Sequence, residues 1–140
     1  MPSKPELKRP YALNSGDGWT YAWGPEFVIK AGERGPGRRL ALVEMTTRKG
    51  EEPDDHTHPA EDEIFYLLQG TVAFRCGGEV FDLTDGGFVF LPRGLEHGFT
   101  IRSDSDVRML IVTSPADDAA SGGWGGIVGN LEIGGVSVTG

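Results

Sequence analysis

The sequence predicts an all-β fold in a single domain, and three observations lead to this prediction. The chain has 140 residues, a length typical of one domain with its own core. Its 22 glycines and 9 prolines divide it into short apolar runs, as many turns between short strands require. Several runs alternate apolar and polar residues with period two, and no long segment carries a helical stripe. We therefore expect antiparallel strands in a sandwich, a barrel or a jelly roll.

The expected strands are separated by turn residues. In chain order they are 26–30, 39–47, 55–58, 63–69, 71–76, 79–83, 88–91, 96–102 and 107–113. Period-two alternation is clearest in RLALVEM and TVAFRC. Pro59 ends the run DHTH, because proline cannot donate to a β-ladder. Gly77-Gly78 predicts a tight hairpin, and Pro92 and Gly94 predict a turn between the next two runs.

The two ends of the chain differ in composition from its middle. We expect residues 1–25 to form an N-terminal arm, 26–115 the barrel, and 116–140 a Gly-rich C-terminal tail. Within the arm, the run WTYAWG has two interpretations, a cap on the mouth of the barrel or an edge strand. The tail also has two: a flexible segment, or an extended segment packed on a neighbouring strand or subunit. The second would use its apolar side chains, which are Trp124, Ile127, Val128, Leu131 and Ile133.

Charge and composition exclude several classes of partner. A formal net charge of −8 without a basic stripe argues against nucleic acid. No stretch has the apolar length that crosses a bilayer, so we expect no membrane association, and the first residues lack the apolar core of a signal peptide. Cys76 is the single cysteine, which is consistent with a reducing compartment. We expect a cytoplasmic protein that acts on a small molecule.

Two of the three histidines lie in one acidic stretch, DDHTHPAEDE. His56 and His58 are two residues apart, so they point the same way from an extended segment. Glu63 opens the next apolar run, where burying a carboxylate is costly unless a cation or another partner compensates it. His97 follows a predicted turn that returns it to the same interior face. Taken singly, each histidine has an ordinary alternative, a solvated loop or a hydrogen-bonded residue; together they favour a metal site.

The spacing of these residues resembles a known family. GEEPDDHTHPAEDEIFYLLQG and GGFVFLPRGLEH are similar to the two signature motifs of the cupins, small jelly-roll β-barrels, and occur in the same order. The resemblance covers roughly residues 26–115. Further stretches, FVIKAGERGPGRRLALVEM, DEIFYLLQG and MLIVTSPA, look like the small quercetin-dioxygenase-like cupins. The chain departs from the second motif at Ile101, where the family usually has an asparagine that is not a metal ligand.

The resemblance implies a single cupin barrel that holds one divalent transition metal, which would be Fe, Mn, Ni, Co, Cu or Zn. It assigns His56, His58, Glu63 and His97 as the ligands. Asp62 is an alternative to Glu63, because some cupins use a shorter spacing. We prefer Glu63, which keeps the full interval to the glycine that closes the motif.

Three further residues should lie beside this site. Phe65 and Leu67 alternate with Glu63, and Phe99 lies two residues beyond His97, so all three should face the interior. They have two interpretations, a hydrophobic substrate pocket or ordinary core.

The resemblance leaves three functions open. The first is a metal-dependent dioxygenase acting on a small aromatic or enolic compound, with Glu63 as the catalytic base. The second is a redox-neutral isomerase or polyketide cyclase, and the third a non-catalytic barrel that binds a small molecule. Because jelly rolls leave sheet edges, we also expect a homodimer in which the arm before residue 26 or the tail after residue 115 contributes a strand.

Overall fold

The structure is a computed structural model, and it describes residues 9–22, 24–32, 39–115 and 137–139. The strands are β1 (Gly18–Ala22), β2 (Glu26–Gly32), β3 (Ala41–Thr47), β4 (Asp62–Gln69), β5 (Val72–Cys76), β6 (Glu79–Leu83), β7 (Phe88–Leu91), β8 (His97–Ile101), β9 (Val107–Ser114) and β10 (Ser137–Thr139). Within those ranges there is no helix, and so none that is long and apolar enough to cross a membrane. The all-β prediction is confirmed.

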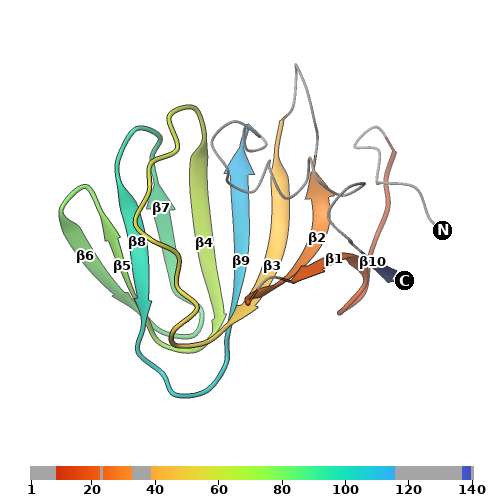
Figure 1. Cartoon of the computed structure of the whole chain (residues 1–140). Coiled ribbons are helices and arrows are strands. Elements are labelled where there is room, and N and C mark those ends of the chain that lie inside the picture. Colours follow the sequence, from red (N-terminus) through yellow and green to blue (C-terminus); the bar gives the residue numbers. More distant parts are fainter. Residues whose placement is uncertain (1–8, 23, 33–38, 116–136, 140) are drawn as a thin grey trace.

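The strands form two antiparallel sheets that make a jelly-roll barrel (Figure 1). One sheet has the order β10-β1-β2-β3-β9-β4-β7, and the other has the order β6-β5-β8. The core lies between them. Its centre is an aromatic trio, Phe65 of β4, Phe74 of β5 and Phe99 of β8, with ring centroids 5.1 to 6.0 Å apart. Strands from both sheets therefore close on one apolar interior, as the alternation of buried and exposed residues requires.

The predicted turns have the backbone that their residues favour. Gly77 and Gly78 have φ values of 57° and 85°, and they join β5 to β6 in a two-residue hairpin in which Cys76 pairs with Glu79. Positive φ at both central residues matches the twist of the flanking strands, which is why two glycines suit this position.

One expected strand is absent, and one of the two interpretations of WTYAWG, a strand, is realised. Residues 55–58 do not form a strand; the segment makes a single β-bridge, between His56 and His97. Beyond this bridge the partners change: the amide of Gly94 donates to the carbonyl of His58, and the amide of Ile101 donates to the side chain of Glu52, so the ladder does not extend. In the expected arm, residues 18–22 form β1, which pairs with β2, so WTYAWG contributes a strand. β10 pairs with the other side of β1, whereas the apolar tail residues 124–133 lie outside the described residues.

Candidate metal centre

The segment between β3 and β4 positions the first two histidines by lying against β8 (Figure 1). His56 and His97 exchange two backbone hydrogen bonds, each 2.9 Å long. The backbone amide of Gly94 donates to the carbonyl of His58 at 2.9 Å. At the start of the segment, a carboxylate oxygen of Glu52 accepts from the amide of Ile101 at 3.2 Å. Backbone contacts thus bring the two sequence clusters into register.

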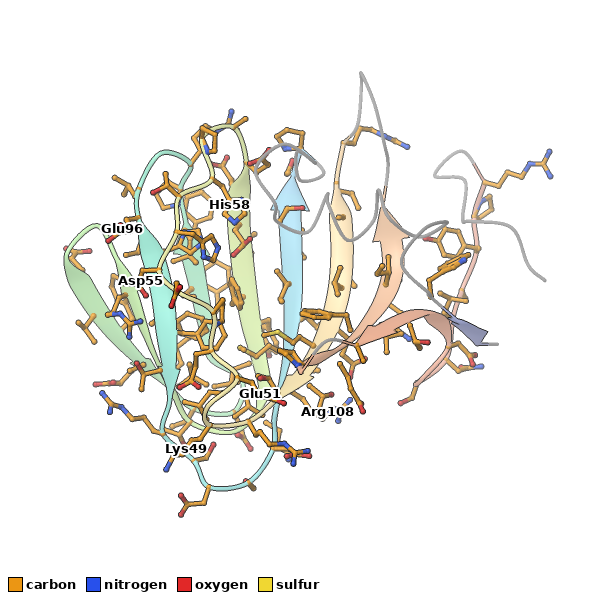
Figure 2. The ribbon with its side chains drawn as sticks, in the orientation of Figure 1. Lys49, Glu51, Asp55, His58, Glu96 and Arg108 are labelled. Atoms are coloured by element: carbon orange, nitrogen blue, oxygen red, sulfur yellow. The ribbon has the colours of Figure 1, made fainter. Side chains whose placement is uncertain are left out.

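An ion pair holds the same segment from the outside. Arg75 of β5 donates to Asp55 through Nη2 at 2.7 Å and through Nε at 3.3 Å. The hydrogen bond from Arg75 lowers the pKa of Asp55 below its ordinary value. Gly98 of β8 makes room for this pair, because a Cβ at that position would lie 1.9 Å from Oδ1 of Asp55. Figure 2 shows Asp55 over β8, with His58 farther along the segment.

The three histidines come together at one place inside the barrel. One ring nitrogen from each of His56, His58 and His97 lies within 4.8 Å of the others. His58 and His97 are buried, with 2% and 4% of their surface exposed, whereas His56 is exposed. Nδ1 of His56 lies 2.9 Å from the carbonyl oxygen of Asp54. Because a carbonyl can only accept, this nitrogen carries a proton, and Nε2 is the ring nitrogen that could bind a metal.

Two buried carboxylates lie beside these rings. Glu63 is 1% exposed, and its two oxygens are each 3.5 Å from a ring Nε2, one of His58 and one of His97. Glu61 is also 1% exposed, and its Oε2 lies 3.7 Å from Nδ1 of His58. His58 therefore lies between two carboxylates, one facing each ring nitrogen. Asp62, the alternative ligand, instead pairs with Arg93 at 3.0 Å, and this pairing lowers the pKa of Asp62.

The surroundings of His97 favour a neutral imidazole. Burial, and then the proximity of His56 and His58, lower the pKa of His97 from 6.5 to about 4, and the backbone of Leu95 offsets part of this shift. Neither ring nitrogen has a hydrogen-bond partner of good geometry among the described residues. A neutral ring with an uncommitted lone pair is the form in which histidine binds a metal.

The residues at this place fit a divalent transition metal. Nitrogens bound to one ion at about 2.1 Å can be no more than about 4.2 Å apart, so rings within 4.8 Å need only small rotations to share an ion. Imidazole and carboxylate are suitable ligands for these metals. The two buried carboxylates, Glu61 and Glu63, would offset both charges of the ion. The three histidines are thus positioned to bind a metal, as expected, and Glu63 as a fourth ligand stays a prediction.

The three expected pocket residues lie in the interior. Phe65, Leu67 and Phe99 are 3%, 0% and 6% exposed, and they pack in the core next to the site. Their inward orientation agrees with the alternation argument, and the role of a substrate pocket stays a prediction.

Sequence reasoning did not assign a role to Glu61, Arg75 or Gly98. Glu61 lies in irregular backbone just before β4, where spacing says nothing about burial. The other two act through Asp55, which is 20 residues from Arg75 in the chain. A signal was present only for Gly98, which lies inside an expected strand, where a glycine often marks a close approach of another segment.

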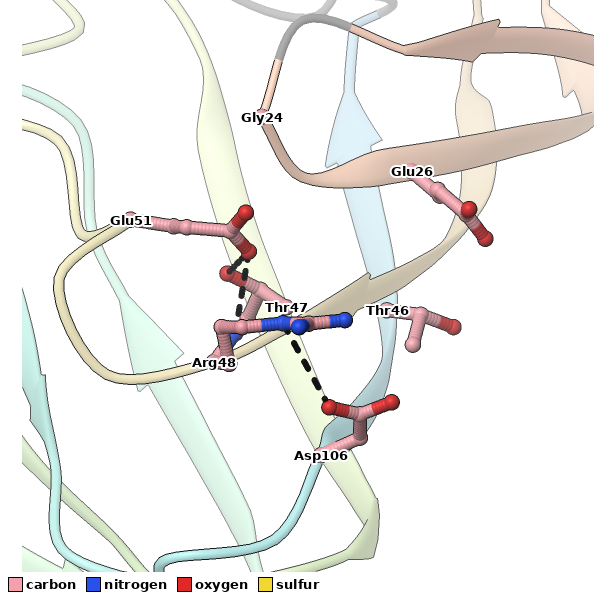
Figure 3. Close-up of a pocket in the computed structure, with 7 residues that line it drawn as sticks. All are labelled: Gly24, Glu26, Thr46, Thr47, Arg48, Glu51 and Asp106. Carbon is pink, nitrogen blue, oxygen red and sulfur yellow. Dashed lines mark hydrogen bonds and ion pairs between the residues drawn. The ribbon is translucent and has the colours of Figure 1, made fainter.

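A small polar pocket lies at the start of the segment 48–61, which joins β3 to β4 and carries His56 and His58; we call this stretch the histidine segment (Figure 3). Its lining residues are Gly24, Glu26, Thr46, Thr47, Arg48, Glu51 and Asp106. The carboxylate of Glu51 accepts from the hydroxyl of Thr47 and from the amide of Arg48, both at 3.1 Å. These bonds close the turn after β3, so we interpret the pocket as part of the frame that leads into the histidine segment.

Comparison with known proteins identifies relatives of the chain. Residues 43–113, half of its length, match the family described as Cupin domain. The chain is 29% identical over 102 residues to quercetin 2,3-dioxygenase of Bacillus subtilis (strain 168), an overlap of 72% of this chain and 30% of that protein. It is 31% identical over 68 residues to polyketide synthase CurC of Streptomyces cyaneus, covering 49% of this chain and 44% of CurC. The chain covers less than two thirds of the length of each of these curated relatives.

Solved structures with the same fold extend the comparison. KdgF from Halomonas sp. superposes with a TM-score of 0.68 at 23% identity, covering 81% of this chain and 99% of that one. Pac13 from Streptomyces, a nucleoside dehydratase, superposes with a TM-score of 0.64 at 12% identity, covering 81% and 88%. At such identities these structures establish the barrel and carry no statement about activity.

Proposed function

Because this chain belongs to the cupin family, we propose that it is a metal-dependent dioxygenase acting on a small aromatic or enolic compound. Its four ligands would be His56, His58, Glu63 and His97. The observation that carries the proposal is the buried carboxylate of Glu63, 3.5 Å from ring nitrogens of two of the three clustered histidines. Similarity to a quercetin 2,3-dioxygenase supports the class of reaction.

Glu63 is the group that would move a proton in this reaction. When bound, the ion supplies a Lewis acid that stabilises a deprotonated hydroxyl or an enolate. Glu63 accepts the proton of the substrate hydroxyl at one of its carboxylate oxygens. The base is then one of the proposed metal ligands itself, beside His58 and His97. Phe65 and Phe99 are buried two residues along their strands from Glu63 and His97, so the adjoining interior is apolar, and a low local dielectric strengthens electrostatic interactions.

A redox-neutral reaction is the second candidate, as an isomerase or a polyketide cyclase. The observation in its favour is the similarity to CurC and to the tetracenomycin polyketide synthase protein TcmJ of Streptomyces glaucescens, which is 32% identical over 66 residues. Such an enzyme would use the metal only to polarise a carbonyl. A third candidate, a non-catalytic binding barrel, is favoured by the close packing of Phe65, Leu67 and Phe99 in the interior.

The metal and the use of dioxygen separate these candidates. We would purify the full chain without added metal, measure its metals by elemental analysis, and follow oxygen uptake with flavonols, catechols and 1,3-diketones. The dioxygenase proposal expects Fe, Mn, Ni, Co or Cu and oxygen uptake that depends on that metal. Zinc as the resident ion, or turnover that proceeds equally without oxygen, would replace it with the redox-neutral reaction. Stoichiometric metal without turnover of any substrate in the panel would favour the binding barrel.

Glu63→Gln tests the carboxylate itself, with Asp62→Asn as the matched control. Glutamine keeps the shape of Glu63 but loses its charge, and three histidines still hold the ion, so occupancy should fall modestly. Turnover should fall by about 10²- to 10⁴-fold, the usual contribution of a positioned base. Asp62 pairs with Arg93 outside the site, so Asp62→Asn should leave turnover unchanged. Wild-type turnover in Glu63→Gln, or an equal loss in Asp62→Asn, would refute the role of Glu63.

A further inference from the structure

The outer face of the larger sheet carries an apolar surface that no described residue covers. Its most exposed side chains are Tyr66 of β4 and Phe88 and Phe90 of β7, at 42%, 55% and 47%. They belong to two cross-strand rows, which run over β9, β4 and β7: Val112-Ile64-Phe90 and Leu110-Tyr66-Phe88. Residues directly opposite each other on neighbouring strands are in contact, so the six side chains form one continuous patch, here called the aromatic face.

The strand alternation shows that the aromatic face points away from the interior. On each of the three strands, the residue between two members of the face is buried: Phe65 at 3%, Val89 at 5% and Ile111 at 1%. These inward residues belong to the core. Surface strands normally place polar residues at the outward positions, because one side of such a sheet meets water. Contact with water does not account for aromatic and aliphatic residues at six outward positions, whereas contact with another surface would.

The area of the face suits the centre of a protein interface. With about 200 Å² for a fully exposed aromatic side chain, the three rings alone expose roughly 300 Å². Patches of about 300–600 Å² are the largest on typical monomers and are often functional. An interface of standard size buries about 800 Å² on each partner, of which somewhat more than half is apolar. The rings and their three aliphatic neighbours supply most of that apolar part.

The charges around the face favour a second copy of the chain. Two copies that each carry a net charge of −8 repel one another unless the surfaces in contact are neutral. Two pairs of opposite charges lie beside the face and are formed within the chain, Asp62 with Arg93 and Glu44 with Arg108. The six side chains of the face are uncharged, and these four charges beside it compensate one another. A surface of this kind is complementary to itself about a two-fold axis.

We propose that the aromatic face is the centre of a two-fold homodimer interface, in which β4, β7 and β9 of one copy pack against the same strands of another. This differs from the strand exchange expected from the sequence. In the structure β10 of the same chain already pairs with β1, so the sheet edge at that side is covered from within the chain. The opposite edge strand, β7, has only four residues and offers a short ladder. Face-to-face packing uses the exposed rings, and strand exchange does not.

Sedimentation velocity of the full chain, from about 1 to 100 µM, tests the proposal. The wild type should sediment as a dimer of the 15.1 kDa chain. Phe88→Lys should raise the dimer dissociation constant by about 100-fold or more, because two-fold symmetry places the change in the interface twice. Phe90→Lys should act in the same way. The control is Val80→Lys, which changes a residue of β6 that is 61% exposed on the other sheet, and it should remain dimeric.

Three results would overturn the proposal. A monomeric wild type over the whole range would mean that the face has another occupant, such as residues 116–136 of the same chain. Dimers of wild-type strength in both Phe88→Lys and Phe90→Lys would place the interface elsewhere. Dissociation by Val80→Lys alone would place it on the other sheet. Circular dichroism and thermal unfolding of each variant establish that a loss of dimer is not a loss of fold.

Discussion

Gly98→Ala should weaken metal binding, although residue 98 is not one of the expected metal ligands. A Cβ at this position would lie 1.9 Å from Oδ1 of Asp55 and 3.0 Å from Nη2 of Arg75. Ordinary carbon contacts begin at about 3.5 Å, so the carboxylate must retreat by about 1.5 Å. That movement separates Asp55 from Arg75 and displaces the segment that carries His56. Arg75 also attracts Glu52 of the same segment, but its direct ion pair is with Asp55.

The size of the effect follows from the exposure of the pair. Asp55 and Arg75 have side chains that are 36% and 37% exposed, so solvent screens their ion pair, and its loss costs about 1 kcal/mol or less of stability. Metal binding should suffer more, because residues that orient metal ligands typically contribute about 10- to 100-fold in affinity. We expect a loss near the lower end of that range, since His58 and His97 stay in place.

A double-mutant cycle measures this coupling. The affinity for Co²⁺ would be measured by competition with a chelator in the wild type, Gly98→Ala, Asp55→Ala and the double variant. Asp55→Ala removes the oxygen that meets the new Cβ, so Gly98→Ala should have little further effect in that background. Wild-type affinity in Gly98→Ala would refute the reasoning. So would two effects that simply add, because the close contact between positions 98 and 55 would then not be the cause.

Two further variants test the site from within. His97→Ala should lower metal occupancy strongly and leave a folded but less stable barrel, as seen by elemental analysis and circular dichroism; full stoichiometric metal would contradict the assignment of His97. Glu61→Gln should weaken Co²⁺ binding by about 10- to 100-fold and shift the Co²⁺ absorption spectrum, because Glu61 faces Nδ1 of His58 at 3.7 Å and orients that ring. An unchanged spectrum and affinity would mean that Glu61 only packs.

Much of the fold could be predicted because its signals are local. The alternation in β4, where Glu63, Phe65 and Leu67 are buried and their neighbours are not, is visible in the sequence. The glycine pair between β5 and β6 likewise predicts its own hairpin. One wrong expectation, a strand at 55–58, and one open alternative, a strand within WTYAWG, depended on the same kind of information. Residues 55–58 make a single bridge, and residues 18–22 pair with β2, because pairing depends on which backbone groups a neighbouring segment offers.

The sequence by itself determined that this is an all-β chain whose histidines belong to two motifs of one family, since residue types and short spacings carry that information. Only the tertiary structure decided how the acidic residues 61–63 divide their roles. Glu61 and Glu63 are buried beside the histidine rings, whereas Asp62 turns outward to Arg93. It also decided that Gly98 gives Asp55 room and that aromatic rings of β4 and β7 gather on one outer face. These outcomes depend on the register between strands distant in the sequence, which local patterns do not specify.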